Sequence, residues 1–293
     1  MRVSGCTYLR YGVKFGYPFV EAIRSVLPIV DEFIVALGPC DDGTEEKLRQ
    51  IGDAKIRIVH TQWNEHMTQH PQSSLRGFVY GQQRSIALFN CTGDWAFYID
   101  SDELVHEDER EKIRAAMEKY QDDPEVEALV FDYIHFYGNA NTYAWSPRWY
   151  RTAARIVRNT VPFWTPKGMA FVIVQTQKRG RYPRAAHTGA TIYHYGWVRG
   201  EAQLQLKQND VLKFGRDLKS PPFQYEQIDP LTLRRFTGTH PEAIRDWLPP
   251  ADGVFEADPD YRLTSRDRKH RMMLAVEERF GMRFNKKHYH MVR

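Results

Sequence analysis

Three acidic residues, Asp100, Asp102 and Glu103, directly follow the apolar run Trp95–Ile99. Two carboxylates about 5 Å apart at an effective dielectric near 20 repel each other by roughly 3 kcal/mol, so a compensating partner is expected. A hard divalent cation, Mg²⁺ or Mn²⁺, takes oxygen ligands and keeps open positions for the phosphate oxygens of a nucleotide. The alternative is structural: Ser101 or Asp102 caps a following helix, worth about 1 kcal/mol, and the other acids are solvated.

The position of these acids favours a binding site. An apolar run of this length between polar residues is typical of an interior strand of a parallel sheet. In open α/β sheets, ligands bind in the crevice at the carboxyl ends of the strands. Since side chains alternate along a strand, Asp100 and Asp102 are expected on one side of the chain. The Asp-x-Asp pattern therefore predicts a cation and phosphate site at this edge.

The elements that must position this site alternate along the first 135 residues. We expect strands at 3–9, 31–38, 55–61, 95–100 and 126–136, and helices at 18–28, 44–51, 76–89 and 107–120. This alternation predicts βαβ units and an α/β fold with a mainly parallel sheet. The segments 170–177 and 191–197 are predicted as antiparallel additions to one edge. A further capped helix is predicted from Ser265 to a glycine stop at Gly281.

Composition excludes several classes of protein. Of the 293 residues, 42% are hydrophobic and 27% are charged, close to the averages for globular proteins, so disordered and fibrous architectures are poor interpretations. No run approaches the roughly 20 apolar residues of a membrane span, and no signal peptide is visible at the N-terminus. The expected location is the cytoplasm, with the inner face of the membrane left open.

Charge is modest but uneven. A formal net charge of +4 is too small to indicate nucleic-acid binding, and no nucleic-acid partner is predicted. Cationic residues collect in 178–184 and from Arg262 onward. Such clusters are usually solvated, but the basic tail leaves peripheral association with an anionic membrane surface open. In that tail, Met272, Met273, Leu274 and Phe280 are expected to form one apolar side that packs on the core.

A set of short motifs runs through the chain up to about residue 245. They are SGCTYLR at 4–10, FIVALG at 33–38 with DDGT at 41–44, QR at 83–84, GDW at 93–95 with DSDE at 100–103, HFYG at 135–138, WYR at 149–151, RIVRN at 155–159, YHYGWV at 193–198 and GTHP at 238–241. Together they resemble the family 2 glycosyltransferases of GT-A fold, and a bacterial subgroup of that family. We accordingly expect a GT-A catalytic domain over residues 1–210 and an extension of loops and helices over 211–293, packed on the same domain.

The resemblance implies a metal site. Asp100 and Asp102 correspond to the family's Asp-x-Asp motif, with Asp102 as the direct ligand of Mn²⁺ or Mg²⁺ and Asp100 nearer the ribose or a bridging water. GT-A enzymes often bring a distant histidine onto the metal, and His194 occupies the matching motif. The alternative for His194 is a packed, hydrogen-bonded core histidine.

The resemblance also implies a nucleotide site. Asp42 matches the position that contacts the base or ribose, Thr7 and Arg10 lie where the first strand opens onto the nucleotide, and Arg84 matches a position near the diphosphate. Ordinary loop and helix polarity is the alternative for Arg10 and Arg84. Aromatic residues after position 136 could stack on acceptor sugars, although core packing is the default for about half of them.

The implied function is metal-dependent transfer of a sugar from a UDP-, GDP- or dTDP-sugar to a glycan or glycolipid in bacterial surface polysaccharide or lipopolysaccharide assembly. Inversion, which is usual in the family, requires a carboxylate base. The segment 164–168, where related chains tend to carry an acid, has none. Asp132 is the candidate, with capping or pairing to an arginine of RIVRN as its alternative.

Two rival functions remain open. A sugar nucleotidyltransferase would normally carry a glycine-rich phosphate loop with Arg and Lys after the first strand, and residues 7–16 are not such a loop. A non-catalytic nucleotide- or glycan-binding protein on the same fold would need no base.

Overall fold

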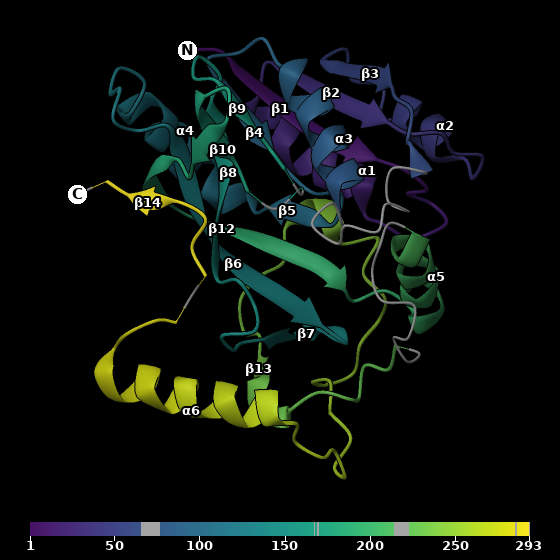
Figure 1. The fold of residues 1–293 in the computed structure, drawn as a ribbon. Helices are drawn as coiled ribbons and strands as arrows, with labels where there is room; N and C mark the ends of the chain where they lie inside the picture. The colour runs from purple at the N-terminus through teal and green to yellow at the C-terminus, as the bar shows by residue number, and fades with distance from the viewer. Residues whose placement is uncertain (66–76, 167, 169, 214–222, 285, 293) are drawn as a thin grey trace.

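The centre of the fold is a set of parallel strands from the first part of the chain (Figure 1). The structure is a computed structural model that describes residues 1–65, 77–166, 168, 170–213, 223–284 and 286–292. The strands lie in the order β3 (Ile56–His60), β2 (Glu32–Leu37), β1 (Val3–Leu9) and β4 (Trp95–Tyr98). β1, β2 and β4 are almost entirely buried, as expected for parallel strands covered on both faces. The α/β class predicted from the sequence is confirmed.

Helices cover both faces of these strands. One core lies between the sheet and three helices, α1 (Phe19–Val26), α2 (Thr44–Arg49) and α4 (Arg110–Lys119). On the other face, the sheet packs against α3 (Phe78–Phe89). Two 3-10 turns adjoin α1 and α4, η1 (Leu27–Ile29) and η4 (Glu107–Glu109). The predicted helices are confirmed with shorter bounds, except that residue 76 of the predicted 76–89 lies outside the described residues.

The second half of the sheet is antiparallel. Beyond β4 follow β8 (Thr152–Arg158), β6 (Ala128–Tyr137), β7 (Asn139–Ala144) and β13 (Leu233–Arg235), each antiparallel to its neighbour. β8 was not among the expected strands, because its arginines hid its apolar pattern. Their charges are satisfied inside the fold: Arg155 pairs with Glu103, and Arg158 donates to backbone carbonyl groups between residues 120 and 126.

The long strand β12 (Arg184–Trp197) corrects one prediction. Residues 191–197 were predicted as an antiparallel edge addition, but β12 pairs in parallel along β6 and in antiparallel fashion with the short strand β5 (Glu103–Val105). Strand direction depends on the connection that precedes a strand. Here Ala185, near the start of β12, pairs with Ala128 at the start of β6, so the two strands run the same way.

An irregularity in β12 sets which side chains face the site. Between His187 and Thr191, β12 advances by four residues while its partner β6 advances by two. Gly189 lies in this stretch with φ +74°, a left-handed conformation that favours glycine. Beyond it, His194 is the partner of His135 on β6.

A second prediction is also corrected. Residues 170–177 do not extend the edge of the main sheet but contribute β10 (Val172–Thr176) to a separate antiparallel sheet with β9 (Phe163–Trp164) and β11 (Arg179–Arg181). Phe163, Phe171 and Ile173 pack in the same core as residues of α3. The apolar side chains of this segment therefore cover a face of the sheet instead of lengthening it.

The C-terminal segment packs on the same sheet. It forms α5 (Glu201–Lys213), η5 (Pro230–Thr232), β13, η6 (Glu242–Ile244), α6 (Ser265–Phe280) and β14 (His290–Met291), which pairs with β12. Thr264 and Asp267 form a capping box at the start of α6, and Gly281 ends the helix at φ +65°. The predicted helix at this position is confirmed, whereas a domain boundary at residue 210 stays a prediction. None of the helices in the described ranges is long and apolar enough to cross a membrane.

Candidate active site at the carboxyl end of β4

The site is centred on Asp102, in the turn between β4 and β5. This buried carboxylate lies among three nitrogen atoms: its Oδ1 is 3.5 Å from Nε2 of His194, and its Oδ2 is 3.4 Å from Nη2 of Arg199 and 3.5 Å from Nζ of Lys207. Burial alone would raise the pKa of Asp102, but Lys207, His194 and Arg199 hold that pKa well below its ordinary value. Asp102 is therefore ionised at neutral pH.

The sheet brings Asp102 and His194 together. β5 follows Asp102 directly and pairs with β12, so that His194 lies opposite Glu103, and Tyr195 donates its backbone N–H to the carbonyl of Asp102 at 2.8 Å. A strand thus follows the acids where the structural alternative expected a helix. Neither Ser101 nor Asp102 is a helix cap, since η4 begins after His106.

A second histidine fixes the orientation of His194. Nε2 of His135 lies 2.6 Å from the carbonyl oxygen of Tyr150, and Nδ1 of His135 lies 3.0 Å from Nδ1 of His194. A carbonyl oxygen only accepts, so Nε2 of His135 donates. Burial lowers the pKa of His135 well below its ordinary value, so its Nδ1 accepts from Nδ1–H of His194. When His194 is neutral, its proton therefore lies on Nδ1 and the lone pair of Nε2 is directed toward Asp102.

With His194 neutral, Nε2 of His194 and Oδ1 of Asp102 are two acceptors that face each other, and a divalent cation fits between them. Cis ligands of an octahedral Mg²⁺ at 2.0–2.1 Å lie about 3 Å apart, close to the 3.5 Å seen here. A Cβ at Gly196 would lie 2.6 Å from Nε2 of His194 and 2.9 Å from Oδ2 of Asp102, so glycine keeps this space open. No group of three His, Cys, Asp or Glu side chains suited to a metal occurs among the described residues. Two protein ligands nevertheless suffice for Mg²⁺, which usually keeps waters and substrate phosphates as its other ligands.

The other two acids of the motif form a separate network. Glu103 is fully buried and accepts from Nε and Nη2 of Arg155 at 2.8 and 2.6 Å and from the hydroxyl of Tyr133 at 3.1 Å. Asp100 accepts from the hydroxyl of Tyr98 and from Arg155 at 3.1 Å. Burial and the neighbouring Glu103 raise the pKa of Asp100, whereas Arg155 keeps the pKa of Glu103 low despite burial. These contacts do not include Asp102, so the motif is divided between two networks.

The expected nucleotide-binding residues lie along the same edge, with one exception. Arg10 and Asp42 follow the carboxyl ends of β1 and β2, and Thr7 lies inside β1. Arg10 pairs with Glu65 at 2.6 Å, and Asp42 accepts from the backbone N–H of Lys14 at 2.7 Å. These contacts hold both side chains in place, and their nucleotide role stays a prediction.

The exception is Arg84, which is fully buried. Its guanidinium lies over the rings of Tyr98 and Phe171, and one nitrogen donates to the carbonyl of Gly168 at 2.7 Å. Within the described residues, Nε and Nη2 of Arg84 have no hydrogen-bond partner. The structure therefore places this cation beneath the site, next to the Asp100 network.

Asp132 lies on the other face of the sheet. Tyr133 and His135 of β6 point toward the Glu103 and His194 side, so Asp132 points the opposite way. Its oxygens lie 3.6 Å from Nε2 of His187 and 3.8 Å from Nη1 of Arg283, at a cavity of about 350 Å³. Asp132 is thus not brought together with Asp102, and its role as a base stays a prediction.

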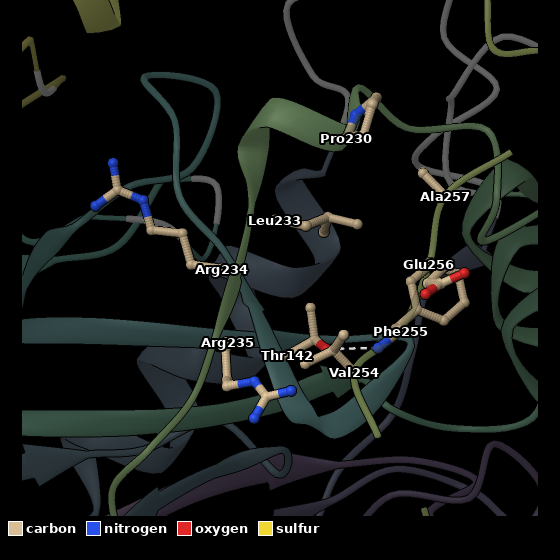
Figure 2. A pocket seen from close by; sticks show the side chains of 9 residues that line it. All are labelled: Thr142, Pro230, Leu233, Arg234, Arg235, Val254, Phe255, Glu256 and Ala257. Atoms are coloured by element: carbon tan, nitrogen blue, oxygen red, sulfur yellow. Dashed lines mark hydrogen bonds between the residues drawn. The ribbon is translucent and has the colours of Figure 1, made fainter. Parts of the chain in front are cut away.

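A larger cavity of about 400 Å³ lies at the far end of the sheet, beside β7 and β13 (Figure 2). Apolar and charged side chains line it together: Thr142, Pro230, Leu233, Arg234, Arg235, Val254, Phe255, Glu256 and Ala257. The hydroxyl of Thr142 accepts from the backbone N–H of Phe255 at 2.7 Å and joins the two sides. None of the expected site residues lines it.

Three residues of the site carried no assigned role in the sequence. His135 belongs to the HFYG motif, which gave a resemblance but no function, and Gly196 belongs to YHYGWV. Lys207 lies on α5, outside every motif, and no local signal could have connected it to Asp102. Its contact depends on how α5 packs beside the turn after β4.

Comparison with known proteins gives only distant likenesses. No protein-family model and no curated protein matches the chain. Among solved structures, S. aureus TarS 1–349 is 14% identical with a TM-score of 0.35, covering 54% of this chain and 47% of its own. Glucosyl-3-phosphoglycerate synthase from Mycobacterium tuberculosis, in complex with Mn²⁺, UDP and phosphoglyceric acid, is 19% identical with a TM-score of 0.32, covering 45% of this chain and 43% of its own. The chain thus spans less than half the length of these two proteins, and likenesses at these TM-scores do not decide function.

Proposed function

We propose that this protein is a glycosyltransferase that uses a nucleotide-sugar donor and a divalent cation. The proposal rests on one observation: Oδ1 of Asp102 and Nε2 of His194 lie 3.5 Å apart at the carboxyl edge of the sheet, with two cationic side chains beside them. A neutral imidazole and a carboxylate at this distance are the oxygen and nitrogen ligands that a divalent cation takes, whereas a protonated His194 would pair directly with Asp102. The motifs of the sequence resemble those of an enzyme family with such a site.

Asp102 and His194 would hold Mn²⁺ or Mg²⁺. When bound, such an ion neutralises the charge that develops on the diphosphate leaving group. His135 holds His194 in the tautomer that presents Nε2, and Gly196 leaves the space that the ion needs.

Arg199 and Lys207 would bind the donor phosphates. The side chain of Arg199 is fully buried, and the carbonyl groups of Gly196 and Phe15 at 2.8 and 2.9 Å fix its guanidinium beside Asp102, so its part would be a fixed positive charge behind the phosphates. Lys207 is partly exposed and reaches the site from α5. Both cations contact the Asp102 oxygen that faces away from His194, which leaves the other oxygen to the metal.

The acceptor would lie near Trp149 and Trp197. Trp149 is 5.4 Å from the ring of His135 and 5.6 Å from the ring of Trp197, and both indoles are partly exposed. Aromatic rings stack on the apolar faces of sugars with little loss of rotamer freedom. A glycan or glycolipid acceptor in surface polysaccharide or lipopolysaccharide assembly follows from the sequence resemblance.

One observation favours a second candidate, a non-catalytic nucleotide- or glycan-binding protein. Asp132, the predicted base, lies on the opposite face of the sheet from Asp102. A binder would need the cation and phosphate contacts but no base.

A panel of UDP-, GDP- and dTDP-sugars with and without Mn²⁺ tests the proposal. A ligand that binds only the native state at 100 times its Kd stabilises the protein by about 2.7 kcal/mol. We expect one nucleotide class to raise Tm only with Mn²⁺ and to be hydrolysed slowly, and Asp102→Asn to remove both effects. Asp252→Asn, at an exposed aspartate, is the control. Stabilisation without turnover, even with acceptor glycans added, identifies the binder. No stabilisation by any of the nucleotides refutes the glycosyltransferase and the nucleotide binder, and stabilisation by an acceptor glycan alone identifies a glycan binder.

A further inference from the structure

The C-terminal helix α6 is attached to the body through one side (Figure 1). Leu274 is buried, Glu277 forms a bidentate ion pair with Arg151, and Arg271 donates to Asp229 at 2.8 and 2.7 Å. The helix lies at the periphery of the fold, beyond β7 and β13. Its other side faces away from these contacts.

That outer side carries large apolar side chains. Met272 is 63% exposed and Phe280 is 66% exposed, with the partly exposed Val276 one turn from each. The spacing of four residues places the three in one row along the helix. Met282, which is 52% exposed, follows Gly281 at the end of the helix. The sequence-based expectation of a single apolar side was wrong: Leu274 packs inward, whereas Met272 and Phe280 face outward.

The charged residues of α6 are also unevenly distributed between its inner and outer sides. Two of its three acids are buried, Asp267 in the capping box and Glu277 against Arg151, and the third, the exposed Glu278, lies 3.7 Å from Arg234. Three exposed cations adjoin the apolar row: Arg268, Lys269 and Arg279. Residues 262–292 contain nine Lys and Arg against three Asp and Glu, so the outer side is strongly basic.

We propose that the outer side of α6 binds the surface of an anionic lipid bilayer. A basic helix with a row of Met, Val and Phe lies in the membrane interface with its apolar row in the acyl boundary and its cations at the headgroups. A second copy of the chain is a poorer partner, because two such basic faces repel each other. A nucleic-acid backbone offers its phosphates to the cations but nothing to the apolar row.

Vesicle co-sedimentation of the full chain tests this docking. Wild type should bind vesicles of phosphatidylcholine with 30% phosphatidylserine and not pure phosphatidylcholine, with binding weakened at high salt. Met272→Ser with Phe280→Ser, and separately Arg268→Gln with Lys269→Gln, should each lower the partition coefficient at least tenfold. All four positions are exposed, so the fold and Tm should not change.

Matched controls change side chains of the same kind elsewhere. Leu231→Ser, at an apolar residue that is 60% exposed, and Arg245→Gln, at a side chain that is 74% exposed, should leave binding unchanged. Equal binding by wild type and the α6 variants, or no binding of wild type to the anionic vesicles, refutes the proposal. So does a dimer that Met272→Ser with Phe280→Ser dissociates, or a DNA affinity that exceeds the vesicle affinity.

Discussion

Asp102 and Glu103 are adjacent in the chain and both are buried, yet their surroundings differ. Glu103 accepts hydrogen bonds from Arg155, Tyr133 and the backbone N–H of Asp100 at 2.6–3.1 Å. The side-chain nitrogen atoms next to the carboxylate of Asp102 lie farther away, at 3.4–3.5 Å. A carboxylate saturated with short hydrogen bonds stabilises the fold, whereas one surrounded by cations at longer distance retains capacity for a ligand. We therefore interpret Glu103 as a structural acid and propose Asp102 as a functional acid within a single motif.

The largest expected effect is on the structural acid. Arg155→Met removes the partner of a fully buried Glu103 and should lower the free energy of unfolding by about 3–5 kcal/mol. Urea denaturation measures it. Arg114→Met, at an exposed side chain that pairs with Glu118, is the control and should change stability by less than about 1 kcal/mol. A similar small loss in Arg155→Met would contradict the structural role of Glu103.

Substitution of Asp102, the proposed functional acid, should reduce metal binding strongly and stability only a little. Asp102→Asn should lower Mn²⁺ affinity by about 100-fold or more, because loss of a residue that only supports a metal ligand typically costs 10–100-fold. Calorimetric titration of Mn²⁺ with nucleotide present measures the affinity, and urea denaturation should show a smaller loss of stability than Arg155→Met. If Asp102→Asn binds Mn²⁺ as wild type does, Asp102 is not the ligand.

A smaller effect is expected at His135, which touches His194 but not Asp102. His135→Phe removes the acceptor that sets the tautomer of His194 and should weaken Mn²⁺ binding by about 10–100-fold. Electron paramagnetic resonance of free Mn²⁺ gives the affinity without any measurement of activity. His187→Asn, on the opposite face of the sheet, should leave it unchanged. Should His135→Phe retain full affinity, the histidine pair has no role in binding the ion.

The smallest effect concerns pH. Arg155 keeps the pKa of Glu103 below its ordinary value despite burial. Such a carboxyl stabilises the native state fully above its unfolded pKa, about 4.3, and loses that contribution as pH falls through the folded pKa. Asp100 has a raised pKa and acts in the opposite sense. The free energy of unfolding should therefore fall between pH 5 and pH 2, and Glu103→Gln should flatten this slope. An unchanged slope would show that Glu103 titrates alike in both states.

Local sequence patterns predicted the helices and strands whose apolar periodicity and caps lie within the segment itself. The parallel strands and α6 are of this kind, since apolar runs and caps are contained within each segment. β8 was missed because Arg155 and Arg158 are buried only through partners distant in sequence. The direction of β12 was wrong because it depends on the path of the chain before it.

The candidate site was predicted in part for a similar reason. The motif resemblance joined Asp102 to His194, but Lys207 gave no signal. Strand geometry could have excluded Asp132 from the face of His135, because the two lie an odd number of residues apart in one strand. The sequence alone does not show that His135 faces the site, since that follows from the packing of β6 against β12.

The number of residues in the irregular stretch around Gly189 determines which face of the sheet the later side chains of β12 occupy. β12 gains an even number of residues over β6 there, and His194 consequently emerges on the same side as His135. Removing one residue from 188–190 would turn every later side chain of β12 to the opposite face of the sheet. Residues 191–197 could still form the strand, but His194 would no longer face Asp102. Length variation in this bulge is therefore tolerable only in steps of two, so a stretch distant from Asp102 determines which side chains of β12 face it.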